Sequence, residues 1–262
     1  MIRCIAMDLD DTLLDDKLDI SKENRTALRK AMKKGIKILL ASGRMVQSMK
    51  IYSAMLELDI PLIAYNGAVI QESVSGKILY SNPVPLDDAF KVIDEFKTRG
   101  IHINIYLKDE LYMNELTVWG DRYARDVRVK AHVVNDIKKI MDIEPYKMLG
   151  IGEVPVIEMM QEYLLGRDDI NLDFIRSKPH YLEILASGVS KGSALKKVTE
   201  SWDFDRSEVM AIGDAPNDIS MIEWAGTGVA VGNASEPVKK SADMIVATNN
   251  NNGVAEAINK IL

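Results

Sequence analysis

Short, unbroken apolar runs alternate with helical segments along the first part of this chain. Apolar runs lie at Ile2–Met7, at Ile36–Leu40 and after Pro61, where the third run ends at Tyr65-Asn66-Gly67. Two predicted helices separate them, one bounded by its N-cap Ser21 and the stop signal Gly35, the other over Met45–Leu58. Strands without polar alternation are typical of a parallel sheet that helices cover on both faces.

The same order returns in the last third of the chain. Predicted strands lie at Val209–Ile212, Gly228–Val231 and Met244–Val246, and predicted helices at Ser190–Trp202, at Asn217–Ala225 and after Gly253. We therefore expect residues 1–83 and 187–262 to form one catalytic core of the α/β class, with a Rossmann-like, doubly wound parallel sheet.

The segment between these halves has a different pattern. It combines a predicted helix, Leu86–Arg99, with strands such as Ile101–Tyr106 and Leu111–Met113, in which apolar and polar residues alternate. Such alternation indicates a sheet with one face in water. We expect residues 84–186 to form an inserted α+β domain on two short connections, placed to act as a lid over a site.

Composition excludes several classes of partner. The chain of 262 residues has a formal net charge of -6, which argues against a nucleic-acid surface. It has no run of about 18 apolar residues of the kind that spans a bilayer, and Asp8, Asp10 and Asp11 interrupt the first apolar run before it resembles a signal peptide. A single cysteine, Cys4, cannot form an internal disulfide. These features favour a cytoplasmic protein that binds neither nucleic acid nor membrane.

The strongest chemical signal follows the first strand. Carboxylates at Asp8, Asp10 and Asp11 are followed by Thr12. Past the carboxyl end of a parallel strand, alternate side chains can enter one pocket, and open α/β sheets bind ligands at that edge. Clustered carboxylates repel one another unless a cation neutralises them, and oxygen ligands of this type suit Mg²⁺.

A second acidic cluster, Gly213 to Asp218, follows the predicted strand Val209–Ile212 in the same way. It contains Asp214, Asn217 and Asp218. Either cluster alone is compatible with an ordinary helix cap. Two of them at strand ends of one parallel sheet indicate a shared site.

Two further segments point to an anion. Ser42, Gly43 and Arg44 follow the second apolar run, where a hydroxyl and backbone N–H groups at a helix start can cradle an anion. Lys191 lies in the first turn of a predicted helix, where it opposes the helix dipole and needs a compensating negative charge. Such local conflicts are typical of functional sites.

These four segments together resemble the motifs of haloacid dehalogenase-type hydrolases. The order is Asp-x-Asp-x-Thr at 8–12, Ser-Gly-Arg at 42–44, Lys-Gly at 191–192 and Gly-Asp-x-x-Asn-Asp at 213–218. The insertion and the run that begins at Asp218 and ends in Gly-Val-Ala-Val-Gly-Asn-Ala look like the Cof-type branch with a C2 cap, the sugar-phosphatase-like members. Asp11 stands where many relatives have glycine, and it adds a carboxylate without an assigned role.

The resemblance implies a magnesium-dependent phosphatase that acts through an aspartyl-phosphate. Asp8 is then the nucleophile and Asp10 the general acid and base. Mg²⁺ is held by the Asp8 carboxylate, the Asp10 backbone carbonyl and the Asp214 carboxylate. Phosphate is bound by groups of Leu9, Ser42, Gly43, Lys191 and Asn217. Thr12 supports the site, and Asp218 either orients Lys191 or binds a metal-bound water.

The substrate implied by the resemblance is a small phosphorylated metabolite, with sugar phosphates as the usual class. Arg44 is expected to contact the substrate or to pair with a neighbouring carboxylate. Glu183, near the end of the insertion, is expected either to reach a sugar hydroxyl or to make a structural hydrogen bond. His102, His132 and His180 lack a second ligand at metal spacing and are read as structural or surface residues.

Three alternatives follow from the same motifs. A phosphomutase needs the same four segments and is distinguished by an isomerised product without free phosphate. A non-catalytic protein that binds phosphometabolites is expected to lose the nucleophile or the acid, and both are present here. A receiver of the response-regulator type is far shorter and lacks the insertion.

Overall fold

The structure is a computed structural model that describes residues 1–57 and 59–262. Its contacts divide the chain into two compact units, Met1–Tyr80 with Ser190–Leu262, and Ser81–Val189. These bounds lie a few residues from the expected limits of the insertion, 84–186. Each unit is described below by itself.

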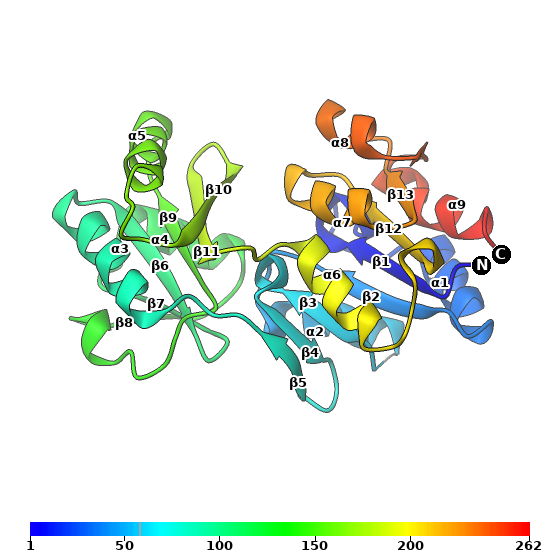
Figure 1. The fold of residues 1–262 in the computed structure, drawn as a ribbon, viewed down its shortest axis with the longest axis horizontal. Coiled ribbons are helices and arrows are strands. Elements are labelled where there is room, and N and C mark those ends of the chain that lie inside the picture. The colour runs from blue at the N-terminus through cyan, green and yellow to red at the C-terminus, as the bar shows by residue number, and fades with distance from the viewer. Residues whose placement is uncertain (58) are drawn as a thin grey trace. The chain divides into compact units, whose positions relative to one another are not determined.

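The first unit contains an eight-stranded sheet in the order β14-β13-β12-β1-β2-β3-β4-β5 (Figure 1). Its strands are β1 (Cys4–Asp8), β2 (Lys37–Ala41), β3 (Pro61–Ala64), β4 (Val69–Glu72), β5 (Ile78–Ser81), β12 (Val209–Gly213), β13 (Thr227–Ala230) and β14 (Met244–Ile245). The six strands from β14 to β3 pair in parallel, so the predicted doubly wound, Rossmann-like sheet is confirmed.

The sheet continues beyond its parallel strands at one edge. Strand β4 pairs with β3 in antiparallel fashion, with Ala64 opposite Val69. The chain reverses there through one short turn of 3₁₀ helix, η2 (Tyr65–Gly67), so no crossover helix intervenes. A two-strand return of this kind needs only a tight turn, whereas a parallel partner needs a long connection.

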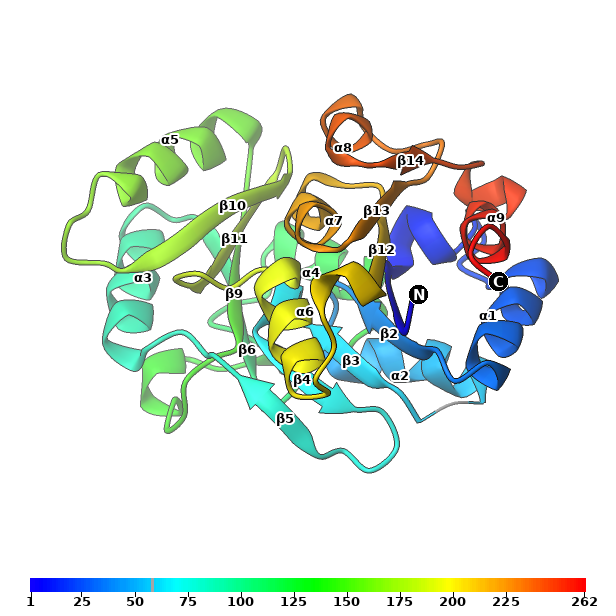
Figure 2. The same ribbon diagram turned by 45° about the vertical axis from the view of Figure 1, so that its right-hand side comes forward.

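Helices cover both faces of this sheet (Figures 1 and 2). They are α1 (Lys22–Lys33), α2 (Val46–Leu56), α6 (Lys191–Glu200), α7 (Ile219–Trp224), α8 (Glu236–Ser241) and α9 (Gly253–Asn259). Buried side chains of α6 and α7, such as Leu195 and Met221, pack with Ala6 of β1 and Ala211 of β12. The predicted cap Ser21 accepts a hydrogen bond from the Asn24 N–H, and Gly35 has a positive φ of 81°. The expected end of the second helix at Leu58 lies outside the described residues.

The register of the central strands aligns their carboxyl ends. Asp8 lies opposite Ala41 of β2, and Met7 lies opposite Ile212 of β12. The residues after these three strands therefore emerge side by side at one edge of the sheet. The segments 8–12, 42–44 and 213–218 named above begin at these strand ends.

The second unit contains a six-stranded sheet in the order β10-β11-β9-β6-β7-β8. Its elements are α3 (Leu86–Thr98), β6 (His102–Leu107), β7 (Glu110–Met113), α4 (Val118–Asp126), β8 (Ala131–Val133), β9 (Lys147–Ile151), α5 (Val154–Leu165), β10 (Leu172–Lys178) and β11 (Tyr181–Ala186). Helices α3 and α5 form an apolar core with one face of the sheet, which confirms the predicted α+β character.

The expectation that β6 has one wet face is wrong, because every residue of β6 is buried. Ile103 and Ile105 belong to the core with α3 and α5. On the other face, α4 covers the strand: the Tyr106 hydroxyl donates to that of Tyr123 at 2.6 Å. The polar alternation thus reflects a polar interior contact and not water. Among the described helices, none combines the length and apolar character required to cross a bilayer.

Candidate active site

A buried lysine between two carboxylates forms the centre of the site. Lys191 Nζ lies 2.5 Å from Asp8 Oδ1 and 2.5 Å from Asp218 Oδ1. The three side chains are all buried and come from β1, from the start of α6 and from the turn before α7. Of the two roles expected for Asp218, the structure shows direct contact with Lys191.

These two anions resolve the conflict noted in the sequence. Lys191 is the first residue of α6, after the N-cap Ser190, where the helix dipole disfavours a positive charge. Burial alone lowers the pKa of Lys191, but the charges and hydrogen bonds of Asp218 and Asp8 outweigh burial and raise that pKa. Lys191 therefore stays charged in the interior.

Asp8 is held in an environment that disfavours its charge. Burial raises the pKa of Asp8 well above its usual range; Lys191 lowers it, while Asp218, Asp214 and Asp10 raise it further. A carboxylate in this state gains stabilisation from any cation that binds beside it. The geometry thus favours a positively charged partner in addition to Lys191.

The surroundings of Asp214 also disfavour the charged form of its carboxylate. Burial is the main reason that the pKa of Asp214 rises to about 7, although the hydrogen bond from Thr12 lowers it. The Thr12 hydroxyl donates to Asp214 Oδ1 at 2.6 Å, which agrees with the supporting role expected of Thr12. This contact fixes the Asp214 carboxylate toward the segment after β1.

The acidic cluster fits a hard divalent cation. One carboxylate oxygen each from Asp8, Asp214 and Asp218 lie within 4.8 Å of one another. Asp218 Oδ2 already accepts the N–H groups of Asp214 and Ala215 at 3.0 Å, and its Oδ1 accepts from Lys191. Asp8 and Asp214 each use one oxygen in the described contacts, which leaves the second for a metal ion. Carboxylates with such oxygens are the ligands that Mg²⁺ prefers.

Asp10 and Arg44 form a bidentate ion pair. Arg44 Nε donates to Asp10 Oδ2 at 2.8 Å, and Nη2 donates to Oδ1 at 2.6 Å. The guanidinium also lies over the ring of Tyr52, 5.4 Å from its centre. Of the two expectations for Arg44, the structure shows pairing with a carboxylate, and that carboxylate is Asp10.

The other residues expected to bind phosphate follow the carboxyl ends of β1, β2 and β12. Ser42 is buried, and its Oγ accepts the N–H of Arg44 at 3.2 Å, which closes a tight turn over Gly43. Leu9 follows Asp8 directly, and its side chain is buried. Asn217 Nδ2 donates to Asn66 Oδ1 at 3.0 Å.

Asn66, the partner of Asn217, is a buried residue at the same edge of the sheet that none of the four motifs includes. It lies in η2, directly after β3, and only 4% of its surface is exposed. The Asn-Gly pair at residues 66–67 marks a turn at a strand end of the same sheet edge. That position, equivalent to those of Ser42 and Asp214, was the available signal.

A model of the family described as haloacid dehalogenase-like hydrolase matches residues 5–258. The chain belongs to this family. The resemblance drawn from the four motifs is thereby confirmed.

Several similar members of this family are named phosphatases. This hydrolase is 34% identical to the 5-amino-6-(5-phospho-D-ribitylamino)uracil phosphatase YcsE of Bacillus subtilis, over 98% of this chain and 94% of that protein. It is 27% identical to the pyridoxal phosphate phosphatase YbhA of Escherichia coli, over 98% and 97%. A crystal structure of a haloacid dehalogenase-like hydrolase from Bacteroides thetaiotaomicron matches with a TM-score of 0.92 and 33% identity over 100% of both chains. The protein is an enzyme of the phosphatase group in this family.

Asp11 of the hydrolase has a backbone role. Its φ of 57° lies in the left-handed region, which glycine adopts without strain and which Asp and Asn tolerate better than other residues. Its carbonyl accepts the Asn233 side-chain N–H at 2.7 Å, and its side chain is exposed. An aspartate is therefore accepted at this position, which glycine would also occupy without strain.

Glu183 of the hydrolase is paired inside the inserted unit. Its Oε2 lies 2.8 Å from Lys147 Nζ, and its Oε1 accepts from the Ser177 hydroxyl at 2.9 Å. Both charged side chains are buried. The structure therefore shows the structural contact, one of the two expectations for Glu183.

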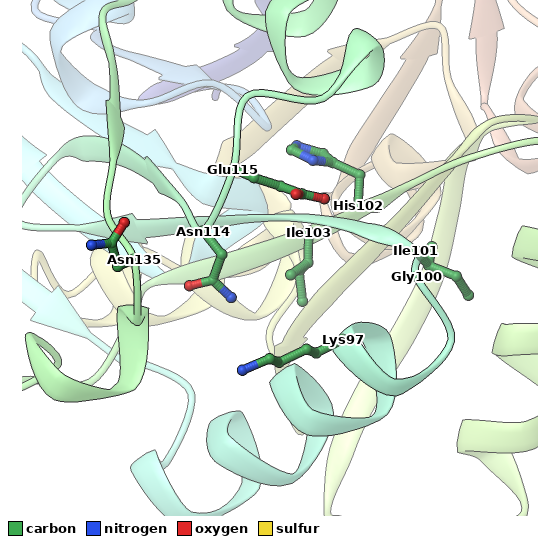
Figure 3. A pocket seen from close by; sticks show the side chains of 8 residues that line it. All are labelled: Lys97, Gly100, Ile101, His102, Ile103, Asn114, Glu115 and Asn135. Atoms are coloured by element: carbon green, nitrogen blue, oxygen red, sulfur yellow. The ribbon is translucent and has the colours of Figure 1, made fainter.

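The inserted unit of the hydrolase also contains a hollow of about 360 Å³ (Figure 3). Lys97 of α3 lies on one side, and His102 and Glu115 lie on the other. Both ring nitrogens of His102 have hydrogen-bond partners and are not available to a ligand: Nδ1 contacts Thr117 and Nε2 contacts Asn104, both at 2.8 Å. Burial lowers the pKa of His102. This histidine is structural, in agreement with the sequence analysis.

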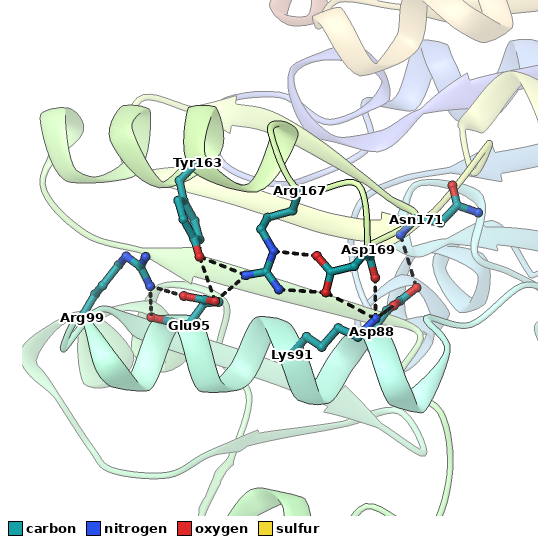
Figure 4. A network of polar contacts seen from close by, with 8 residues as sticks. All are labelled: Asp88, Lys91, Glu95, Arg99, Tyr163, Arg167, Asp169 and Asn171. Carbon is teal, nitrogen blue, oxygen red and sulfur yellow. Dashed lines mark hydrogen bonds and ion pairs between the residues drawn. The ribbon is translucent and has the colours of Figure 1, made fainter.

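A surface network connects α3 with the segment after α5 (Figure 4). Arg167 contacts Glu95 of α3 at 2.5 Å and Asp169 at 2.6 Å, while Lys91 contacts Asp88 at 3.1 Å. Only Asp169 of these side chains is exposed and the others are half-buried, and ion pairs near the surface contribute little individually. The network is best understood as a support for the helix packing of the inserted unit.

Proposed function

We propose that this hydrolase is a magnesium-dependent phosphatase that releases inorganic phosphate from small phosphorylated metabolites, with sugar phosphates as the principal class. The observation that carries the proposal is the convergence of Asp8, Lys191, Asp214 and Asp218 within hydrogen-bonding or metal-ligating distance. The named substrates of the two phosphatase relatives, both small phosphorylated molecules, support the substrate class.

In the proposed reaction, Asp8 attacks phosphorus through one carboxylate oxygen. The bond from phosphorus to the leaving oxygen breaks, and Asp10 gives that oxygen a proton. Asp10 then takes a proton from water as the water oxygen attacks the aspartyl-phosphate. Inorganic phosphate leaves, and the Asp8 carboxylate is restored. The Asp10 side chain thus serves as the general acid in the first step and as the general base in the second.

The other side chains neutralise and orient. Lys191 offers positive charge to the phosphoryl oxygens, and Asp218 holds the lysine in place. Ser42, Asn217 and the backbone of Leu9 and Gly43 are assigned to the phosphoryl oxygens. When bound by Asp8, Asp214 and the Asp10 carbonyl, Mg²⁺ supplies Lewis-acid stabilisation of the transferring phosphoryl group. Arg44 donates to both oxygens of the Asp10 carboxylate, so at least one of these hydrogen bonds has to open when Asp10 carries the proton for the leaving oxygen.

A panel of sugar phosphates, nucleotides and cofactor phosphates, assayed for free phosphate, tests this function. We expect turnover of several sugar phosphates in the presence of Mg²⁺. An isomerised sugar phosphate that forms without free phosphate would instead support a phosphomutase. Binding of these compounds without any turnover would support a non-catalytic protein.

Replacement of Asp10 by asparagine is expected to slow turnover by about 10² to 10⁴-fold, because the leaving oxygen and the attacking water both lose their proton partner. An aryl phosphate has a leaving group that needs little protonation. The variant is therefore expected to release one equivalent of the phenol rapidly and then to stall with phosphate on Asp8. Rapid-mix kinetics and intact-protein mass measure this.

The matched control for Asp10→Asn is Asp11→Asn, which removes a neighbouring exposed carboxylate and keeps a residue that tolerates a positive φ. It is expected to retain turnover within a few-fold of the unchanged enzyme. Equal losses in the two variants would contradict the role given to Asp10.

Removal of metal by EDTA is expected to abolish turnover, and addition of Mg²⁺ to restore it.

The binding of Mg²⁺ is also expected to depend on pH. Because the pKa of Asp214 is raised to about 7, the metal-free protein loses stability from this group as the pH rises from about 4 to about 7. A cation competes with that proton, so Mg²⁺ is expected to raise the Tm more at pH 8 than at pH 5. Turnover that persists in EDTA, or an equal rise in Tm at both pH values, would contradict the metal site.

A further inference from the structure

The turn after β3 has an unusual backbone. Tyr65, Asn66 and Gly67 have consecutive positive φ values of 52°, 57° and 111°. The left-handed region is unfavourable for Tyr65, whereas Asn66 tolerates it better, and both side chains are buried. Strained backbone of this kind persists only where surrounding contacts hold it, and it concentrates at functional sites.

Hydrogen bonds hold this turn against the Ser42–Arg44 loop. The Asn66 N–H donates to the Ser42 carbonyl at 3.0 Å, and the Tyr65 N–H donates to the Arg44 carbonyl at 3.0 Å. A Cβ added to Gly43 would lie 3.0 Å from Asn66 Oδ1, so the amide packs directly on the loop. The position of the loop therefore depends on the turn.

The same turn also contacts the two other phosphate-binding segments. Asn66 Oδ1 accepts from Asn217 Nδ2 at 3.0 Å, a contact between residues 151 positions apart. A Cβ added to Gly67 would lie 2.3 Å from the carbonyl oxygen of Ser190, the residue before Lys191. One turn thus touches the segments that carry Ser42, Asn217 and Lys191.

We propose that Asn66 is a positioning residue of the phosphate pocket. Its carbonyl oxygen fixes the Asn217 amide, and its side chain fixes the Ser42–Gly43 loop, so that both present their hydrogen-bond donors to one phosphoryl group. The left-handed backbone of Asn66 is what brings the side chain to this place. The inference rests on the proposed function, because the ligand it serves is the phosphoryl group of the substrate.

Asn66→Gly provides the main test, since glycine keeps the positive φ and removes only the amide. We expect the KM for an aryl phosphate and the inhibition constant of inorganic phosphate to rise about tenfold to a hundredfold, as for the loss of a hydrogen bond to a charged group. The Tm is expected to stay the same or to rise. An unchanged inhibition constant would overturn the proposal, and so would a loss of Tm without any change in that constant.

A double-variant cycle with Asn217→Ala tests whether Asn66 affects phosphate binding through Asn217. Because Asn66 acts largely through Asn217, we expect the two losses to be strongly non-additive, with Asn66→Gly adding at most about threefold in the Asn217→Ala background. Fully additive losses would overturn the role of Asn66 as a positioning residue.

Asn66→Asp keeps a side chain of the same size and an acceptor for Asn217, and it adds a negative charge. If Asn66 lies at the phosphate pocket, this variant is expected to weaken inhibition by inorganic phosphate at least tenfold while folding normally; an unchanged inhibition constant would overturn the proposal even if Asn66→Gly failed to fold. Turnover by the unchanged enzyme reports on the proposed function, whereas the ratios between variants report on Asn66 alone.

Discussion

Replacement of Asp8 by asparagine is expected to reduce phosphate release by a factor on the order of 10⁴ or more, because an amide cannot attack phosphorus in place of a carboxylate. The side chain keeps its shape. Lys191 loses one of its two buried anionic partners and keeps Asp218. We therefore expect the variant to fold, with a far-ultraviolet circular dichroism spectrum like that of the unchanged protein.

Single-turnover assays with a sugar phosphate and intact-protein mass measure this effect, since the variant is expected to form no phosphorylated enzyme. Asp8→Ala is a second variant that excludes slow conversion of the asparagine back to aspartate. Turnover by both variants within tenfold of the unchanged enzyme would show that Asp8 is not the nucleophile.

Replacement of Lys191 by methionine is expected to damage both activity and stability. Two buried carboxylates, Asp8 and Asp218, then lose the cation between them, which costs about 3–5 kcal/mol for a broken buried pair. Turnover is expected to fall by about 10³-fold, as for a lost group that stabilises transition-state charge. Urea unfolding and steady-state kinetics measure the two losses.

Two further variants separate the causes of the Lys191 effect. Lys196→Met removes an exposed lysine from the same helix and is expected to change neither quantity appreciably. The double variant Lys191→Met with Asp218→Asn removes one of the two uncompensated charges, so it is expected to recover part of the stability and none of the activity. If the double variant were less stable than Lys191→Met, the electrostatic explanation would be wrong.

The convergence of Asp8, Asp214 and Lys191 could be predicted from the sequence for a physical reason. Strands without polar alternation indicate a parallel sheet, and the carboxyl ends of its strands meet at one edge. Lys191 places a positive charge in the first turn of a helix, where the helix dipole disfavours it, and this indicates a nearby anion. Both arguments require only the order of residues along the chain.

Side-chain partners could not be predicted in the same way. The sequence left two interpretations open for Arg44 and two for Glu183. Arg44 pairs with Asp10 and Glu183 pairs with Lys147, and each pair depends on a distance between segments that are far apart in the sequence. Asn66 was missed because an Asn-Gly pair after a strand is an ordinary turn signal, and its contact with Asn217 joins residues 151 positions apart.

The burial of β6 was mispredicted for a related reason. The polar residues of β6 alternate as on a wet face, and no sequence pattern placed α4 over them. Strands β4 and β5, the last two of the sheet, are short and were not recognised as strands. Packing between elements, and not local propensity, decided each of these cases.

The pairing of β1 with β12 has a consequence for synthesis of the protein. These strands begin at Cys4 and Val209 and lie side by side in the sheet, so the ribosome must translate most of the message before the nucleophile-bearing strand acquires this neighbour. The unit Ser81–Val189 is continuous in sequence and is complete earlier. A nascent chain is therefore expected to fold from the middle outward, with the unit Ser81–Val189 formed before strands β12, β13 and β14 complete the other unit.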